Sequence, residues 1–266
     1  MESTSLQTKK TFKFTNSSGK DSLEVTISET MEPHYSQYVW PCSVVLAQYI
    51  WHHSKSLFKG KHLLEIGAGT ALPSIVATMC ASPDSVTITD NEFFPKCFEN
   101  CRKSIFYNNL GNICDHFNKH NGSNVKRTSK NCPIHLMGLT WGQVSPHFVK
   151  LLQKKNTKDH HAFPNVILGS DCFYDETLFE DVISTIYYLL KSSADFEQQS
   201  SFKPVFLCTY QTRSADWSIS ALLHKWKLEY EDIPLSDFAA DESDIADSGM
   251  PGNHKIEMMK ISLKDK

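Results

Sequence analysis

Short apolar runs alternate along most of the chain with longer segments whose apolar residues recur at helical spacing. The runs that predict strands are His62–Ile66, Ser85–Thr89, His135–Thr140, Val166–Gly169 and Val205–Tyr210. The segments that predict helices are Ala71–Cys80, Phe94–Asn108, Leu178–Leu190 and Ala215–Trp226. Strands that alternate with helices form a mostly parallel sheet, which helices cover on both faces. The predicted fold class is therefore α/β.

The two ends of the chain show a different pattern. Thr11–Thr15 and Leu23–Ile27 alternate between apolar and polar residues on either side of a turn-rich stretch, which predicts an N-terminal β-hairpin. Lys255–Leu263 also alternates and follows a turn, so we expect a last strand there. An apolar run from Pro41 to Trp51 predicts a buried helix, because proline is favoured in the first turn of a helix.

Two polar stretches interrupt the alternation of strands and helices. Cys114–Cys132 is rich in Asn, Ser, Lys and His and joins a helix to a strand, which indicates a surface insertion. The acidic segment Asp237–Asp247 is interpreted as a solvated connection, with a lip that attracts a basic substrate as the alternative. We predict a hairpin extension at residues 1–30 and one domain at residues 31–266, with the polar insertion at 114–133.

The composition is that of an ordinary globular protein, with 40% hydrophobic and 21% charged residues among 266. It excludes intrinsic disorder, collagen and coiled coil. The net charge of -3 gives no bulk attraction to nucleic acid or to an anionic membrane. The apolar runs are far shorter than the ~20 residues of a membrane span, and the polar N-terminal stretch is not typical of a secretory signal. We expect a cytoplasmic and nuclear monomer that binds neither membranes nor nucleic acid directly.

The eight cysteines are scattered, which is typical of small buried side chains in a reducing compartment. Cys97 and Cys101 lie four residues apart on a predicted helix, a spacing that suits two metal ligands on one face. A structural zinc site normally shows two close pairs of Cys or His, and no second pair lies nearby. The expectation is therefore that the protein holds no metal.

The strongest local motif is Glu65-Ile66-Gly67-Ala68-Gly69-Thr70, a strand that runs into a glycine turn before a helix. Glycine allows a tight turn and a close approach of the backbone to a ligand. The dinucleotide fingerprint would need a third glycine where Leu72 stands, so that match is incomplete. Asp90 ends the next strand, where an acid can bind the two ribose hydroxyls of a nucleoside. Its alternative role is a helix cap.

Taken in order, these motifs resemble the seven-β-strand S-adenosylmethionine-dependent methyltransferases, and among them the lysine-methyltransferase-like group called methyltransferase family 16. The resemblance covers residues 38–261 and rests on Val39-Trp40-Pro41, residues 65–70, Asp90, Leu139-Thr140-Trp141-Gly142 and Ser170-Asp171-Cys172-Phe173-Tyr174. It implies a Rossmann-like, seven-stranded sheet with an antiparallel last strand. It also implies S-adenosyl-L-methionine as cofactor and methyl transfer to a lysine or arginine nitrogen of a nuclear or cytosolic protein, with a histone or a chaperone as candidates.

The resemblance assigns seven residues to the cofactor: Trp40, Glu65, Gly67, Gly69, Asp90, Trp141 and Ser170. Gly67 and Gly69 would cradle its methionine part, and Glu65 would orient the glycine loop or the amino group of the cofactor. Asp90 would hold the ribose and Trp141 would pack near the adenine. Without the family argument, the two tryptophans could equally be ordinary core residues.

Asp171 and Tyr174 form the Asp-x-x-Tyr pattern that in this family faces the substrate nitrogen. A hydroxyl can orient a neutral lysine amine, whereas carboxylates suit the guanidinium fork of arginine, so the choice stays open. The Asn-Pro-Pro-Tyr motif of enzymes that methylate nucleic-acid bases is absent after the predicted fourth strand. A small-molecule methyltransferase and a non-catalytic binding protein with the same fold are the remaining alternatives.

Overall fold

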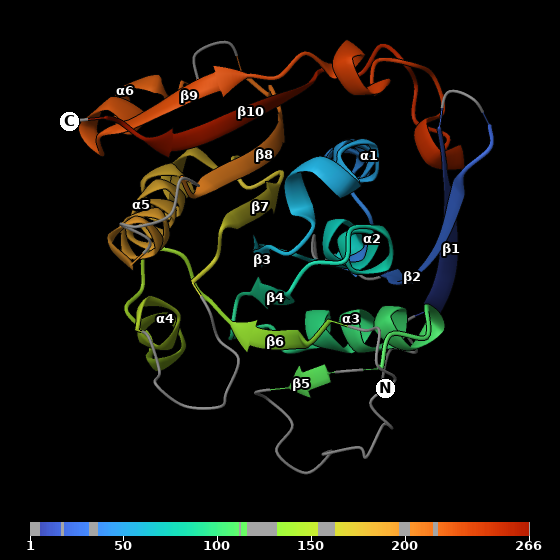
Figure 1. Cartoon of the computed structure of the whole chain (residues 1–266), viewed down its shortest axis with the longest axis horizontal. Helices are drawn as coiled ribbons and strands as arrows, with labels where there is room; N and C mark the ends of the chain where they lie inside the picture. Colours follow the sequence, from blue (N-terminus) through green and yellow to red (C-terminus); the bar gives the residue numbers. More distant parts are fainter. Residues whose placement is uncertain are drawn as a thin grey trace.

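An eight-stranded sheet forms the centre of the molecule (Figure 1). The computed structural model describes residues 6–16, 19–31, 37–111, 113–115, 132–153, 163–196, 203–214 and 218–265. From one edge of the sheet to the other, the strands are β5 (Ile113–Asp115), β6 (Ile134–Gly138), β4 (Ser85–Asp90), β3 (His62–Ile66), β7 (Val166–Ser170), β8 (Val205–Gln211), β10 (Ile256–Leu263) and β9 (Leu228–Asp232). Strand order reverses between β4 and β7, on either side of β3. In open α/β sheets such a switch point places ligands beyond the carboxyl ends of the strands.

The strands from β5 to β8 are parallel, and β10 is antiparallel to both of its neighbours. The fold class and the antiparallel last strand are thereby confirmed. The expected number of seven strands is too low by one, because β5 adds a three-residue strand at one edge. Its Cys114 and Asp115 belong to the sheet rather than to the predicted insertion, of which residues 116–131 lie outside the described residues.

Helices cover the two faces of the sheet in two groups. On one face lie α1 (Pro41–His52), α2 (Leu72–Cys80) and α3 (Lys96–Tyr107), and on the other lie α4 (Pro146–Leu152), α5 (Phe179–Phe196) and α6 (Ser220–Lys225) (Figure 1). Neighbouring strand residues point to opposite faces, so Leu63 packs with the first group and Leu64 with the second. Shorter turns are the π-helix Ser54–Phe58 and the 3-10 segments Glu176–Leu178, Leu235–Phe238 and Ile245–Asp247.

The N-terminal hairpin forms a sheet of its own. Its strands β1 (Leu6–Thr15) and β2 (Ser22–Met31) are longer than the alternating pattern predicted. The hairpin buries Phe12 and Phe14 completely, and β2 packs beside α3. Asn100 of α3 accepts hydrogen bonds from the hydroxyls of Ser28 and Thr30, which joins the two elements through buried polar groups.

The acidic segment at residues 237–247 is packed as well as solvated. Its acidic side chains are exposed, while Phe238, Ala240 and Ile245 are buried in the core beside α1. No residue of the segment lines the cavity of about 570 Å³ at the carboxyl ends of the parallel strands. The solvated connection is therefore correct only for the charged side chains, and the alternative of an acidic lip beside the site stays a prediction.

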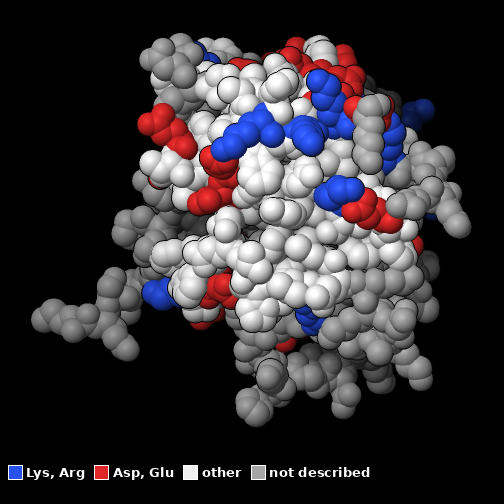
Figure 2. Space-filling view, turned by 90° about the vertical axis from the view of Figure 1, so that its left-hand side faces the viewer, with Lys and Arg blue, Asp and Glu red and all other residues white. Residues whose placement is uncertain are grey.

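Figure 2 shows the side of the molecule that carries α4 and α5. Many of its positive side chains lie in the upper half of the view, several of them beside negative ones, while others lie lower down and much of the area between is uncharged. Ion pairs of α5 include Lys191 with Asp195, and Glu180 with Lys225 of α6. No helix within the described ranges is long and apolar enough to cross a membrane, and His, Cys, Asp and Glu in those ranges form no group of three that could hold a metal ion.

Candidate functional site

A cavity of about 570 Å³ opens at the carboxyl ends of β3, β4, β7 and β8. This volume lies within the range of small-molecule sites. All of the residues predicted for the site line it except Glu65, namely Trp40, Gly67, Gly69, Asp90, Trp141, Ser170, Asp171 and Tyr174. The topology thus brings together motifs that are spread over most of the chain.

The glycine loop presses against Trp141. Gly67 and Gly69 have φ of 57° and 53°, in the left-handed region that favours glycine. A Cβ atom on Gly67 would lie 2.6 Å from Cζ2 of Trp141, closer than two carbon atoms can approach. Only glycine therefore fits at position 67 with Trp141 in place.

Asp90 ties the end of β4 to the glycine loop. Its Oδ2 accepts a hydrogen bond from the backbone N–H of Gly69 at 2.7 Å, and its Oδ1 accepts one from Asn91 at 2.7 Å. Burial raises the pKa of this carboxyl, and the two N–H groups partly offset the rise. The first residue of α3 is Lys96, preceded by Pro95, so Asp90 does not cap that helix. Each carboxylate oxygen keeps a second lone pair for a ligand in the cavity.

Glu65 lies beneath the loop rather than in the cavity. Its side chain is fully buried, and its Oε2 accepts a hydrogen bond from the backbone N–H of Ser74 in α2 at 3.1 Å. Its Oε1 has no hydrogen-bond partner within the described part of the chain. Burial raises the pKa of this carboxyl to about 8, although the Ser74 contact lowers it in part. This placement suits support of the glycine loop and of α2.

The start of α1 forms one wall of the cavity. Trp40 precedes the helix, and its ring centroid lies 4.9 Å from that of Tyr38. The hydroxyl of Ser43 donates to the Trp40 carbonyl at 2.7 Å, which fixes the first turn. Trp40 and Trp141 are both partly exposed to the cavity, so neither is an ordinary core tryptophan.

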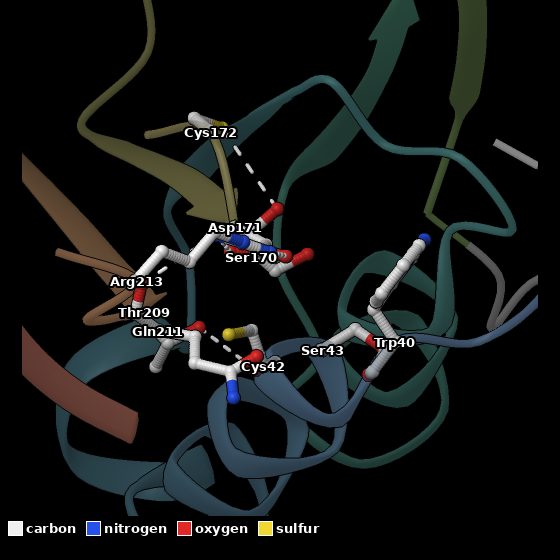
Figure 3. A network of polar contacts seen from close by, with 9 residues as sticks. All are labelled: Trp40, Cys42, Ser43, Ser170, Asp171, Cys172, Thr209, Gln211 and Arg213. Carbon is white, nitrogen blue, oxygen red and sulfur yellow. Dashed lines mark hydrogen bonds and ion pairs between the residues drawn. The ribbon is translucent and has the colours of Figure 1, made fainter. Parts of the chain in front are cut away.

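A bidentate ion pair closes another side of the cavity (Figure 3). Arg213 Nη1 donates to Asp171 Oδ1 at 2.8 Å, and Nη2 donates to Oδ2 at 2.6 Å. The side chains of Arg213 and Asp171 are 27% and 9% exposed, so the pair is largely shielded from water. The carboxylate raises the pKa of the Arg213 guanidinium. The position of Arg213 just after a predicted strand suggests that it faces the active-site side, although a helix-capping role for Ser214 is the simpler account of this segment; the structure places Arg213 in the wall of the cavity.

Backbone contacts hold Asp171, the first residue after β7, against the neighbouring strand β8. Asp171 has a φ of 55°, and its N–H donates to the Thr209 carbonyl at 2.7 Å. The Thr209 hydroxyl in turn donates to the carbonyl of Cys42 at 2.7 Å, so β7, β8 and α1 meet at this point. Burial raises the pKa of the Cys42 thiol well above its usual value, with Asp171 adding to the effect. This cysteine stays a neutral thiol and is not a nucleophile.

Tyr174 stands at the mouth of the cavity. It is 38% exposed, and its ring centroid lies 6.4 Å from that of Trp141. Burial raises its pKa, and the negative charge of Asp90 contributes. The hydroxyl therefore stays protonated at neutral pH and can donate a hydrogen bond.

Residues 19–218 match a family model that is described as lysine methyltransferase. The chain belongs to this family. The curated relatives include the histone-arginine methyltransferase METTL23 of Xenopus laevis. It is 39% identical over 96% of this chain and 92% of its own length. The METTL23 of Homo sapiens is 40% identical over 85% of this chain and 97% of its own length. The resemblance inferred from the motifs is thereby confirmed.

The solved structures agree with this assignment at the level of the fold. A SAM-dependent methyltransferase from Agrobacterium tumefaciens aligns with a TM-score of 0.53 at 11% identity, over 96% of this chain and 71% of that one. A more distant relative by sequence is the protein-lysine methyltransferase METTL21E of Mus musculus, 27% identical over 64% of this chain and 57% of its own length.

The protein is an S-adenosylmethionine-dependent protein methyltransferase, and the cavity fits its cofactor. The absence of a side chain at Gly67 lets Trp141 lie against the glycine loop, where its ring forms part of the cavity wall. Asp90 offers carboxylate oxygens at the end of β4, where a ribose binds in folds of this topology. The cofactor supplies a methyl group on a positively charged sulfur. The chain supplies a shielded, shaped cavity in which an acceptor nitrogen can be aligned with it.

Proposed function

We propose that this methyltransferase transfers a methyl group to a guanidinium nitrogen of an arginine in a histone, and that it acts in the nucleus. One observation carries the proposal: the Asp171 carboxylate stands in the same cavity as Gly67, Asp90 and Trp141, and its two oxygens already hold one guanidinium group, that of Arg213, in a bidentate pair. The relatives that are 39% and 40% identical are named histone-arginine methyltransferases, which supports the same substrate.

An arginine side chain poses a specific chemical problem. Its pKa is above ~12, so it enters as a cation whose charge is shared by three nitrogens. A carboxylate on one edge of the guanidinium concentrates the positive charge there and leaves the opposite nitrogen more nucleophilic. We assign this role to Asp171, whose oxygens each keep one lone pair beyond the bond to Arg213.

We assign to Tyr174 the orientation of the acceptor. Its hydroxyl lies at the cavity mouth and stays protonated, so its O–H can donate to a substrate carbonyl while its oxygen accepts a hydrogen bond from a guanidinium N–H. Trp40, Gly67, Gly69, Asp90, Trp141 and Ser170 are proposed to hold the cofactor, with Glu65 supporting the loop from below. The work of catalysis is then alignment of the nitrogen and exclusion of water.

Lysine is the competing acceptor, because the matching family model carries the description lysine methyltransferase. The test uses histone peptides with a single arginine, which is either kept or replaced by lysine, together with radiolabelled cofactor. Methylation of the arginine peptides alone supports the proposal, and methylation of the lysine peptides alone contradicts it.

The role of Asp171 is tested with Asp171→Ala and, as a matched control, Glu180→Ala. Glu180 also pairs with a cation, Lys225, but it does not line the cavity. Loss of one positioning contact commonly costs a few kcal/mol at the transition state, so Asp171→Ala is expected to lower turnover about 100-fold. Its cofactor affinity should stay within about threefold of the parent value. Near-normal turnover of Asp171→Ala would remove Asp171 from the reaction, and equal losses of affinity and rate would place it among the cofactor contacts.

A further inference from the structure

Large apolar side chains are exposed around the mouth of the cavity. Phe93 and Phe94 follow β4, Val144 follows β6 and Tyr174 follows β7. Their exposed fractions are 67%, 50%, 79% and 38%. Exposed apolar residues scattered singly need no explanation, but a group of them around one opening marks an interaction site. We call these four residues the apolar collar.

The loops that carry the collar lie side by side, because β4 and β6 are neighbouring strands (Figure 1). The Thr140 hydroxyl bonds to Asn91 Oδ1 at 3.2 Å, which links the loop after β6 to the loop after β4. Glu92 Oε2 lies 3.6 Å from Nδ1 of His147, so a second contact joins the loop after β4 to the start of α4, just beyond Val144 in sequence. The loop after β7 joins the other two through Tyr174, whose ring centroid lies 6.4 Å from that of Trp141 in the loop after β6.

The collar is continuous with the catalytic cavity. Phe94 and Tyr174 line that cavity and are also exposed at the surface. A protein that presents a side chain to the cavity must therefore place its neighbouring residues against the collar. This continuity argues for the substrate, rather than for a second copy of this chain, as the occupant.

The charge of the loops also indicates the kind of substrate. Residues 91–95, 139–145 and 171–178 contain Glu92, Asp171, Asp175 and Glu176 but no Lys or Arg. Asp171 is paired with Arg213, and the other acids lie in the same loops as the apolar residues. An acidic and apolar surface complements a segment that is basic and carries an apolar side chain.

We infer that the apolar collar is a docking surface for an apolar side chain of the protein substrate, close in sequence to the methylated residue and within a basic segment. Phe93 and Val144 make this contact without lining the cofactor cavity. The inference rests on the proposed function for the entry of a protein through this mouth. The collar would then select substrates by a residue near the acceptor, in addition to the acceptor nitrogen itself.

The experiment uses short peptides with one central acceptor, either arginine or lysine, flanked by lysines that have been trimethylated in advance, which keeps their positive charge and ensures that the acceptor alone is scored. At each position next to the acceptor, one peptide carries leucine and its twin carries serine. With the intact enzyme we expect one position at which leucine lowers KM by about fivefold relative to serine, as burial of a leucine on a partly open surface allows. The turnover number should differ little, because the contact is made equally before and during transfer.

The variants are Phe93→Ser and Val144→Ser, with Phe106→Ser as the matched control. Phe106 is 75% exposed but lies near the end of α3, away from the cavity residues. The two collar variants should lose the preference for leucine while their affinity for the cofactor is unchanged. Phe106→Ser should keep the preference.

Several outcomes would overturn the inference. They are equal KM values for leucine and serine at every position, an equal loss of preference in Phe106→Ser, and a loss of cofactor affinity in Phe93→Ser, which would make the collar a cover for the cofactor. If lysine peptides alone are methylated, the proposal of an arginine substrate fails. The preference for leucine in those peptides still tests whether the apolar collar is a docking surface. If neither set is methylated, fluorescence anisotropy of the labelled peptides on enzyme saturated with S-adenosylhomocysteine measures the same preference as a ratio of Kd values.

Discussion

Gly67 shows how one missing side chain shapes the cavity. Its φ is positive, and Trp141 occupies the space that a Cβ would need. Two separate penalties therefore act on any substitution there, namely backbone strain and a clash with a ring that lines the cavity. The structure also offers glycines at which only the first penalty applies, so the two can be measured apart.

Gly67→Ala is expected to weaken S-adenosylmethionine binding at least about tenfold, because Trp141 or the loop must move out of the cavity. The control is Gly60→Ala, which has a φ of 67° but nothing within 4 Å of its Cβ. Calorimetric titration of both purified variants measures the difference. If the two variants bind the cofactor equally well, contact with Trp141 does not shape the site.

Arg213 and Asp171 form the second prediction at the residue scale. Arg213→Ala leaves a carboxylate whose side chain is 9% exposed without its cation, which should lower the free energy of unfolding by about 2 kcal/mol. Arg213→Lys keeps the charge but not the fork, so its loss should be smaller. Urea unfolding measures both. Lys203→Ala breaks the exposed pair with Asp265 and should leave the unfolding midpoint unchanged. If Lys203→Ala lowers the midpoint as much as Arg213→Ala does, the ion pair in the cavity stabilises the protein no more than an exposed one.

At the scale of elements, the sequence located those with a strong period and missed those without one. β9 has only Leu228 buried among five residues, so it lacks the alternation of a half-buried strand. The three residues of β5 are too few for any period. α4 is short, but a signal was present: Ser145 accepts a hydrogen bond from the Phe148 N–H, and Pro146 follows it as the first helical residue. That Ser-Pro pair could have identified the helix.

Glu65 couples two elements, β3 and α2, and carries the pH prediction. Its pKa is raised to about 8 in the folded state, while in the unfolded chain it is near ~4.3. Between these values the folded state holds one more proton, so the free energy of unfolding falls as pH rises, by up to about 1.4 kcal/mol per pH unit. Glu65→Gln removes this contribution. In urea unfolding from pH 5 to pH 9, the free energy of unfolding of Glu65→Gln relative to that of the parent protein should therefore rise up to about pH 8.

The control for this pH dependence is Glu176→Gln, which changes an exposed acid. Its stability should follow that of the parent protein at every pH. A constant difference between Glu65→Gln and the parent across the range would show that Glu65 is ionised in the folded protein throughout.

At the scale of the whole molecule, the N-terminal hairpin shares one core with the helices on its side of the sheet. Phe12, Phe14, Val25 and Ile27 belong to the same buried cluster as α1, α2 and α3. The family match begins at residue 19, inside the hairpin. The division into an extension at 1–30 and a domain at 31–266 stays a prediction, and this packing makes it testable.

Phe14→Ala is expected to lower the free energy of unfolding of the entire protein by about 3–4 kcal/mol, because it opens a cavity in that common core. Circular dichroism and tryptophan fluorescence should still report one shared transition. Leu6→Ala on the same strand removes a side chain that is 66% exposed and serves as the control. An unchanged main transition in Phe14→Ala would mean that the hairpin folds as a separate extension.

The sequence alone determined the α/β fold, the glycine loop, Asp90 and the methyltransferase family, because these depend on local period, on glycine geometry and on motif order. Tertiary structure alone decided which side chains meet. Arg213 reaches Asp171 across 42 residues, since β7 and β8 are neighbours in the sheet. Glu65 lies under the loop because the side chains of β3 alternate between the faces. The apolar collar exists because three loops end at one edge, a proximity that no single segment encodes.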